Sequence, residues 1–257
     1  MATGLLTICL GQATKLCGLL LDSDKRYAVR AKLGERTDTA DADGTVIEHS
    51  DGAALSREQL EAVLPRFTGA IQQIPPMYSA LKHQGRRLYE LAREGQEIER
   101  APRSLKIHEL RVTGFESGHF ELDVRCSKGT YIRSLVEDLA AAVGQCAHVT
   151  VLRRLESAPF NRPLMYTLDF LTSTAAQGRA DLDSLLLPAL SALTGWPQVR
   201  VESAAAKRLS QGQAVTLPMA VSAGRVAILG TDGALLGLGE SDADNRLSPK
   251  RWLSAPA

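Results

Sequence analysis

The pattern of hydrophobic residues changes between Leu185 and Pro197, and this change limits the chain to two dissimilar parts. Before it, apolar residues alternate along some segments and recur at helical spacing along others. After Trp196-Pro197, the apolar residues form short β-like runs at 199–201, 214–217, 226–229 and 235–238. Asp232-Gly233, between the last two runs, is typical of a two-residue hairpin turn. We therefore expect a small β-rich domain over residues 197–257, separate from residues 1–188.

Strands and helices interleave in the first part. Residues 27–33 place Tyr27, Val29, Ala31 and Leu33 on one face, which predicts a half-buried strand. A second strand over 120–126 leads into a helix over 132–143, and another strand follows over 147–155. This order of elements argues for a mixed α/β or α+β core.

Overall charge gives no indication of a nucleic-acid partner, because the chain has 30 Lys and Arg residues and 29 Asp and Glu residues. An RNA-binding surface would have to come from local clustering. No apolar run reaches the length of a membrane span, and the first residues lack the pattern of a secretory signal. The four cysteines show no CxxC pairing, so we expect small buried hydrophobes in a cytoplasmic protein without membrane association.

Basic residues cluster around aromatic residues in one stretch of the chain. Lys82, Arg86 and Arg87 lie between Tyr78 and Tyr89. Basic side chains interleaved with aromatic rings suit an RNA backbone with exposed bases. The alternative is an ordinary solvated helix face, which composition alone would favour.

Two further charged features could belong to a site. Asp41 lies in an acidic cluster over 38–44, whose spacing does not fit a calcium loop, so we expect a polar turn from which a carboxylate could project. Arg153-Arg154 lies within an apolar alternation, where an arginine needs a carboxylate or phosphate partner. The alternative for this pair is the surface of a sheet edge. The five histidines have no spacing typical of a metal site or catalytic triad.

Several sequence strings together carry a resemblance to one family. Their order and spacing resemble the bacterial TruB-type tRNA pseudouridine synthases, which act on uridine 55 of the T-loop. The strings occupy residues 21–27, 36–44, 74–82, 126–133, 147–149 and 152–155. The resemblance covers essentially the whole chain. It implies a pseudouridine synthase catalytic domain of the α+β class with a mixed sheet over 1–188 and a PUA-like RNA-binding domain over 197–257.

The resemblance implies roles for individual residues. Tyr27 matches the tyrosine that stacks on the base and is suited to proton transfer at C5, and Asp41 matches an acidic residue near the pocket. Arg153 matches the arginine that pairs with the nucleophilic aspartate and keeps it ionised. Val151 stands where the family often has a tyrosine that contacts the base. Leu171 is expected either in the pocket wall or in the core.

The resemblance also implies a partner and a reaction. Residues 73–103 are similar to the segment that grips the T-loop, so Lys82, Arg86 and Arg87 are expected to contact tRNA. The glycosidic bond is broken, the uracil is turned, and C5 is joined to the ribose, without a cofactor or metal. The target uridine must first leave its stack. We expect the protein to act as a monomer.

The family hallmark, close to G-H-x-G-x-L-D-P-x-A-T-G, is represented here only by Ala2-Thr3-Gly4. The nucleophilic aspartate would lie just before Met1, so the chain as written is expected to form no pseudouridine. It could be a tRNA-binding protein without activity, a fragment, or an active enzyme whose start codon lies upstream. Reading the genomic sequence upstream of Met1 in frame separates these possibilities.

Overall fold

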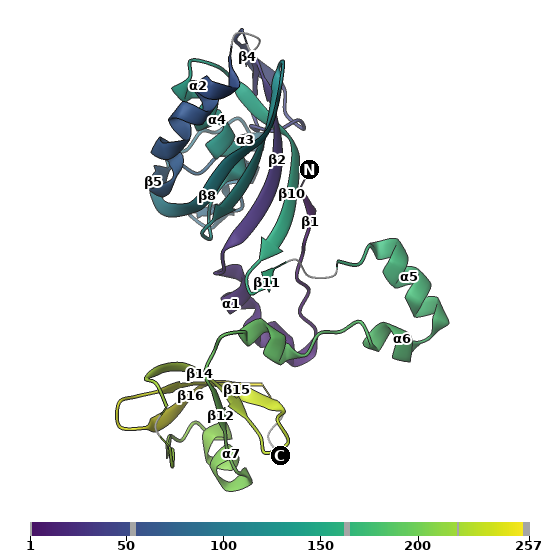
Figure 1. Cartoon of the computed structure of the whole chain (residues 1–257), viewed down its shortest axis with the longest axis vertical. Coiled ribbons are helices and arrows are strands. Elements are labelled where there is room, and N and C mark those ends of the chain that lie inside the picture. Colours follow the sequence, from purple (N-terminus) through teal and green to yellow (C-terminus); the bar gives the residue numbers. More distant parts are fainter. Residues whose placement is uncertain (1, 52–54, 162–164, 220, 254–257) are drawn as a thin grey trace. The chain divides into compact units, whose positions relative to one another are not determined.

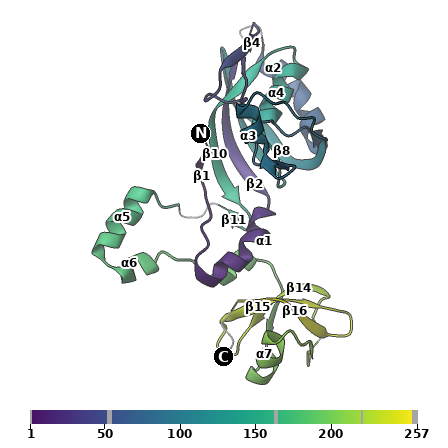
Figure 2. The same cartoon turned by 180° about the vertical axis from the view of Figure 1, so that it is seen from behind.

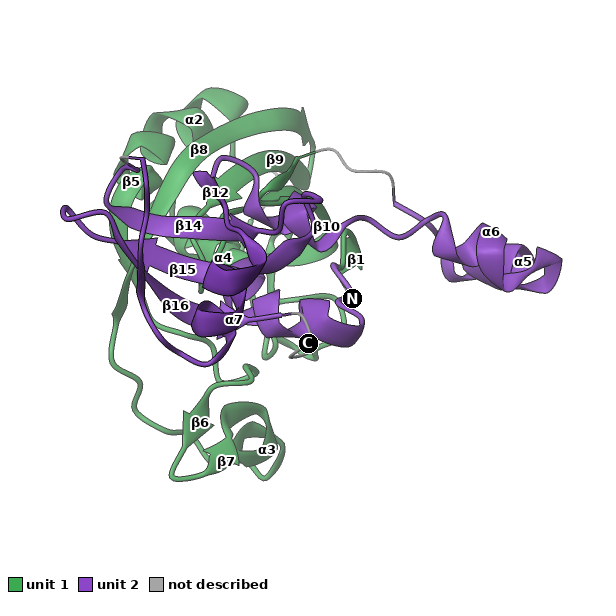
Figure 3. Cartoon of the chain, turned by 90° about the horizontal axis from the view of Figure 1, so that it is seen from below, with its two compact units in different colours: residues 1–6, 22–163 green, residues 7–21, 164–257 purple. Residues whose placement is uncertain are grey.

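The computed structural model describes residues 2–51, 55–161, 165–219 and 221–253. The chain forms two compact units, coloured separately in Figure 3. Unit 1 comprises Met1–Leu6 and Asp22–Pro163, and unit 2 comprises Thr7–Leu21 and Leu164–Ala257. Part of the expected catalytic domain of residues 1–188 therefore lies in unit 2. The expected domain boundaries themselves stay a prediction.

A seven-stranded sheet runs through the described part of unit 1 (Figure 1). Its strands are β1 (Thr3–Gly4), β2 (Lys25–Leu33), β5 (Gly69–Gln73), β8 (Arg103–Glu116), β9 (His119–Cys126), β10 (Ala147–Ser157) and β11 (Phe160–Asn161). Their order is β1-β10-β2-β9-β8-β5, with β11 paired to β10. β1 runs parallel to β10, whereas the other pairs are antiparallel. The mixed sheet matches the expected fold class.

The three strands predicted in the first part of the chain are confirmed as β2, β9 and β10. Val29, Ala31 and Leu33 of β2 are buried, as the alternation predicts, and Tyr27 packs against the same core. We call this side of the sheet the helix face and the opposite side the outer face. Directly paired residues on neighbouring strands point to the same face, so the register assigns a face to each side chain.

Helices cover the helix face of the unit 1 sheet. They are α2 (Arg57–Val63), the 3₁₀ helix η3 (Leu64–Phe67) and α4 (Ile132–Ala142), and Figures 1 and 2 show α2 and α4 on the same side in both views. Ser56 and Gln59 form a reciprocal capping box that starts α2. In α4, Leu135, Val136 and Leu139 are fully buried in the core. The predicted strand–turn–helix sequence from β9 to α4 is confirmed.

Two small hairpins extend unit 1. β3 (Glu35–Thr37) pairs with β4 (Val46–His49), and β6 (Lys82–His83) pairs with β7 (Arg86–Arg87). Helix α3 (Leu88–Arg93) follows β7 directly. Figure 3 shows β6, β7 and α3 standing out from the body of unit 1. Their side chains are therefore presented on a projection rather than on the main sheet.

Unit 2 contains a five-stranded sheet in the order β12-β14-β15-β16-β13 among its described residues. Its elements are η1 (Gly11–Leu16), α1 (Cys17–Leu21), α5 (Leu168–Gln177), α6 (Arg179–Asp183), η4 (Ala189–Leu193), β12 (Gln198–Arg200), α7 (Ser203–Ser210), β13 (Val215–Thr216), β14 (Gly224–Leu229), β15 (Leu235–Ser241) and β16 (Arg246–Trp252). The four predicted β-like runs are confirmed as β12, β13, β14 and β15. The sequence analysis missed β16, where Pro249 and several charged residues obscure the pattern.

The predicted two-residue turn at Asp232-Gly233 is wrong. Residues 230–234 connect β14 to β15, and the Gly233 N–H donates to the Gly230 carbonyl at 3.0 Å. Thr231 and Asp232 therefore occupy the central positions of the turn. Gly233 follows with φ of 83°, a conformation that glycine adopts without steric cost. The connection between β14 and β15 is therefore longer than two residues. The pairing of these two strands also contains a bulge, between Ile228 and Leu229.

Leu16 explains why an N-terminal segment belongs to unit 2. Its side chain is completely buried in a cluster with Leu193, Ala227, Leu238 and Leu253. The neighbouring Lys15 Nζ also donates to the Trp252 carbonyl at 2.8 Å. These contacts join segments more than 170 residues apart in the sequence, beyond the reach of any local pattern.

Two composition-based expectations can be compared with the structure. The four cysteines are free; Cys126 and Cys146 are buried, as expected, whereas Cys9 and Cys17 are only half-buried. Of the helices that the structure describes, none combines the length and apolar character needed to cross a membrane. The expected burial is confirmed for two of the four cysteines, and the cellular location stays a prediction.

Gln73 links β5 to the start of α4 through two side-chain hydrogen bonds. Its side chain is almost completely buried, its Nε2 donates to the Tyr131 carbonyl at 3.0 Å, and its Oε1 accepts from the Tyr131 N–H at 2.8 Å. Tyr131 is the N-cap residue of α4 and makes no capping bond with its own side chain. One buried amide therefore satisfies both backbone groups of that residue.

We predict that Gln73→Leu lowers the free energy of unfolding by about 2 kcal/mol, because it leaves the Tyr131 N–H without a partner, while the Tyr131 carbonyl still accepts from the Leu135 N–H. Urea denaturation followed by circular dichroism measures the change. Gln72→Leu is the matched control, since Gln72 is exposed and bonds only to the Ser104 hydroxyl at 2.7 Å. Equal reductions in the two variants would contradict the assignment.

Candidate functional site

The acidic cluster forms a turn that docks on β10. Ala42 donates its N–H to the Val149 carbonyl at 3.0 Å, and the Val149 N–H donates to the Ala40 carbonyl at 3.1 Å. Asp41, between them, is only 7% exposed, and its Oδ1 accepts from the Thr39 hydroxyl at 2.7 Å. The predicted polar turn is confirmed, and it directs the Asp41 carboxylate inward rather than into solvent.

Arg133, the second residue of α4, pairs with that buried carboxylate. Its Nη1 lies 3.0 Å from Asp41 Oδ2 and donates to the Thr39 carbonyl at 2.9 Å. Its Nη2 donates to the Tyr78 carbonyl at 2.7 Å. A buried carboxylate needs such a partner, because an unpaired charge is costly to desolvate. Arg133 thus joins the acidic turn, α4 and the start of the basic–aromatic stretch.

Sequence reasoning did not nominate Arg133, although a signal was present. Arg133 is the last residue of the string over 126–133 that carried part of the family resemblance. It also directly follows the turn between β9 and α4. That position at a helix start, beside the N-cap Tyr131, places its guanidinium against two loops at once.

Tyr27 lies on the helix face of β2, directly opposite Arg154 of β10 and Val124 of β9. Its ring packs against the hydrophobic core, as does Leu152 two residues before Arg154. Burial raises the pKa of the Tyr27 hydroxyl, and the positive charge of Arg154 opposes this effect in part. The phenol is therefore protonated at neutral pH and offers an apolar ring face beside a cation.

Arg153 and Val151 lie on the outer face of β10, away from Tyr27. They are directly opposite Ala28 and Arg30 of β2, and both are exposed. The structure therefore brings neither residue to Tyr27 or to Asp41. Their expected roles stay predictions. Leu171 is half-buried on α5 of unit 2, and its role in a pocket wall also stays a prediction.

Lys82, Arg86 and Arg87 are all exposed on the β6–β7 hairpin. Lys82 lies directly opposite Arg87, which places two like charges side by side. Such a pair is destabilising unless an anion offsets it. Arg86 instead pairs with Glu94, whose Oε2 accepts from Arg86 Nη1 at 3.1 Å. The hairpin therefore presents a cationic pair at Lys82 and Arg87, and Arg86 is partly neutralised.

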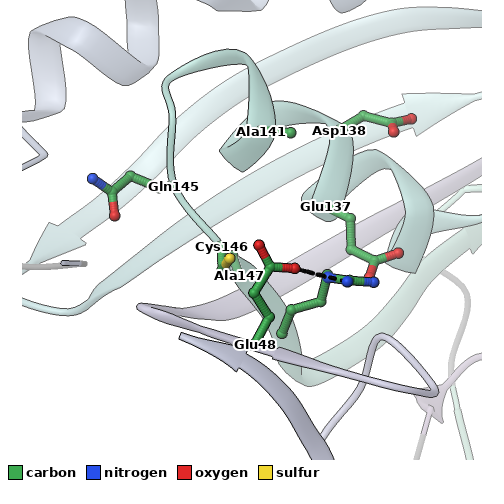
Figure 4. Close-up of a pocket in the computed structure, with 8 residues that line it drawn as sticks. Glu48, Glu137, Asp138, Ala141, Gln145, Cys146 and Ala147 are labelled. Carbon is green, nitrogen blue, oxygen red and sulfur yellow. Dashed lines mark hydrogen bonds and ion pairs between the residues drawn. The ribbon is translucent and has the colours of Figure 1, made fainter. Parts of the chain in front are cut away.

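A cavity of about 240 Å³ lies between α4 and the β3–β4 hairpin (Figure 4). It is lined by Arg36, Glu48, Glu137, Asp138, Ala141, Gln145, Cys146 and Ala147. Arg36 and Glu48 form an ion pair at 2.7 Å, and burial raises the pKa of Glu137 to about 7. None of the residues nominated from the sequence lines this cavity. Among the described residues, His, Cys, Asp and Glu form no group that could hold a metal ion.

We predict that Glu137→Gln stabilises the protein above pH 7 and has little effect below pH 4.5. The folded-state pKa of about 7 exceeds the ordinary value of 4.5, so the wild-type chain loses stability as pH rises between these values. The expected gain at pH 8 is about 1–2 kcal/mol. Thermal melts across this range measure it, with the exposed Glu99→Gln as control. A gain that does not vary with pH would refute the explanation.

Solved structures share this arrangement of elements. The crystal structure of a Cbf5-Nop10-Gar1 complex matches 99% of this chain and 74% of that chain, with a TM-score of 0.73 and 22% identity. The archaeal box H/ACA sRNP Nop10-Cbf5 complex matches 99% of this chain and 74% of that chain, with a TM-score of 0.70 and 19% identity. At this identity the likeness concerns the fold alone. The expected α+β class is confirmed.

Proteins named tRNA pseudouridine synthase B are similar to the chain along nearly its whole length. The one from Chromohalobacter salexigens is 48% identical over 255 residues, which is 99% of this chain and 82% of that protein. The one from Yersinia pestis strain Pestoides F is 47% identical over 259 residues, or 98% of this chain and 80% of that protein. These identities extend well beyond the strings that carried the sequence resemblance.

The family matches divide the chain into three consecutive parts. Residues 1–132 match the TruB family pseudouridylate synthase N-terminal domain, and residues 133–194 match the tRNA pseudouridylate synthase B C-terminal domain. Residues 197–253 match the C-terminal part of pseudouridine synthase II TruB. The first boundary falls between Ile132 and Arg133, so the Arg133–Asp41 pair joins two of the matched parts. With its mixed sheet, its β-rich end and these matches, this chain belongs to the TruB family of bacterial pseudouridylate synthases.

Proposed function

We propose that this protein acts on tRNA and isomerises uridine 55 of the T-loop to pseudouridine. Membership of the family and the name shared by the relatives support the substrate and reaction class. The observation that carries the proposal is the position of Tyr27 on the helix face of β2, where its ring packs against the core and Arg154 lies directly opposite.

Tyr27 supplies an apolar ring on which a uracil can stack. Its hydroxyl is suited to proton transfer at C5 once the base is turned; burial raises its pKa, and the charge of Arg154 opposes this effect in part. The target uridine reaches the ring only after it leaves its stack in the T-loop. The protein therefore contributes a stacking surface, a proton-transfer group and a fixed orientation.

We propose that Arg153 pairs with the nucleophilic aspartate and keeps it ionised, as the family resemblance implies, and that Arg133 positions the loops around the site. Arg133 is held against the buried Asp41 carboxylate, whereas Arg153 is exposed on the outer face. Asp41 acts as a positional residue, because it holds the guanidinium in place through the 3.0 Å contact.

The β6–β7 hairpin is the part of the site that grips the T-loop in this proposal. Lys82 and Arg87 stand directly opposite each other and exposed, an arrangement that a phosphate would stabilise. The β-rich end of unit 2 serves as a PUA-like RNA-binding domain. The protein works as a cytoplasmic monomer.

A tRNA-binding protein without catalysis is the second candidate function. The observation that favours it is that Lys82, Arg86 and Arg87 lie on a projection separate from the sheet that carries Tyr27 (Figure 3). Affinity from phosphate contacts does not require the catalytic residues. The two candidates share the hairpin and differ only in whether product forms.

We predict that, in a chain extended at its N-terminus with the family's hallmark segment, Tyr27→Phe abolishes product formation and leaves tRNA affinity unchanged, because it removes the hydroxyl and keeps the stacking ring. Tritium release from tRNA labelled at C5 of uridine reports the reaction, and filter binding reports the affinity. Tyr166→Phe in unit 2 is the control and should behave like the wild-type chain. Tritium release by Tyr27→Phe at the wild-type rate would reduce Tyr27 to a stacking surface. Binding without release by any variant would support the second candidate.

We predict that Arg87→Ala lowers tRNA affinity and makes binding less dependent on salt. The slope of log affinity against log salt should fall by roughly one unit for each phosphate that the variant no longer neutralises. Arg86→Ala should have a smaller effect, because Glu94 already offsets the charge of Arg86. Filter-binding titrations at several salt concentrations give both slopes. Unchanged affinity in Arg87→Ala would mean that the hairpin is an ordinary solvated surface.

A further inference from the structure

Arg154 has a buried hydrogen-bond donor without a protein acceptor. It lies on the helix face of β10, directly opposite Tyr27. Its side chain is half-buried, and its Nε has no hydrogen-bond partner among the described residues. A buried donor left unpaired is costly, and more so when it carries charge. An acceptor from outside the protein would remove that cost.

A second cation lies beside Arg154 on the same face. Lys25 is on β2, two residues before Tyr27, which makes it a diagonal cross-strand neighbour of Arg154. Its pKa is lowered, first by burial and then by the charge of Arg154. Lys25 Nζ donates to the Ser23 carbonyl at 2.6 Å. The two positive groups therefore repel each other at the partly buried end of the sheet.

Two carboxylates near Lys25 have other partners. Asp22 lies 2.9 Å from Lys128 Nζ, and Asp24 lies 3.0 Å from His108 Nε2. The remaining titratable neighbour of both Tyr27 and Lys25 is Cys126, where burial raises the thiol pKa to about 11 and keeps it neutral. Asp22 and Asp24 offset part of the Lys25 charge, whereas the charge that acts on the Tyr27 hydroxyl is the positive one of Arg154, and this favours an anionic ligand there.

Arg154 is also next to the end of the hallmark sequence. Gly4 of β1 is the direct partner of Arg154, on the side opposite Tyr27. Gly4 has φ of 89°, and a Cβ added to it would collide with the Arg154 carbonyl oxygen. β1 can therefore approach β10 this closely only with glycine at that position. Gly4, Arg154 and Tyr27 form one row across three strands.

We propose that Arg154 and Lys25 bind the backbone phosphate of the nucleotide whose base packs on Tyr27. The proposal rests on the proposed function, because it takes the nucleotide to be part of a tRNA. A phosphate oxygen would accept from the guanidinium and offset the repulsion between the two cations. The site would hold the ribose–phosphate beside Arg154 and Lys25. The base would lie on the face of the Tyr27 ring that does not pack against the core.

The test compares Arg154→Met with Arg125→Met in filter-binding titrations of tRNA at several salt concentrations. Arg125 is a matched control, because it lies on the outer face of β9 with its side chain 45% exposed. Arg154→Met should weaken binding about tenfold and lower the salt slope by roughly 0.7–0.9. Arg125→Met should change neither quantity. Equal behaviour of the two variants would overturn the proposal.

A second variant keeps the test decisive if Arg154→Met folds poorly. Lys25→Met should also weaken binding and lower the salt slope, whereas Arg154→Lys should retain the slope and lose part of the affinity. Wild-type slopes in both Lys25→Met and Arg154→Met would refute the phosphate site. A wild-type chain that fails to bind tRNA would instead overturn the proposed function, and the phosphate site with it.

Discussion

The guanidinium of Arg133 holds together three segments that lie far apart in the sequence. It bonds to Asp41 and Thr39 of the acidic turn and to Tyr78 at the start of the basic–aromatic stretch. Because Arg133 is at the start of α4, these bonds also fix the turn between β9 and the helix. The position of each loop around the candidate site therefore depends on one buried charge and its partner.

The two-residue period of the β-strands decides which side chains lie together on one face of the sheet. Adjacent residues of β10 point to opposite faces, so Arg154 lies with Tyr27 while Arg153 lies outside. The pairing of β10 with β2 also contains two irregularities, next to Val151 and Glu156. The first of these bulges places Val149 and Val151 on opposite faces although they are two residues apart, since they pair with Ala31 and Arg30. A shift of one residue along β10 thus decides which arginine, Arg153 or Arg154, lies beside Tyr27.

Local patterns were sufficient for most of the secondary structure. The alternation along β2 and β9 and the helical spacing of α4 are short-range properties, and each predicted element formed. β16 escaped prediction because Pro249 and the charged residues around it hide the alternation that only sheet pairing restores. The turn at Gly233 was predicted one residue out of place, since dipeptide preference alone does not set the strand register.

The sequence by itself determined the strand–turn–helix order, the α+β class and the family resemblance, because each depends on residue types at short or fixed spacing. Only the tertiary structure decided which arginine faces Tyr27, since that depends on the hydrogen-bond register between β2 and β10. Only the tertiary structure showed Arg133 bonded to Asp41 across 92 residues. It likewise placed Leu16 in the core of unit 2, where distant apolar side chains exclude water together. Hydrophobic period is a local property, whereas register, ion pairing and core membership are decided by contacts between distant segments.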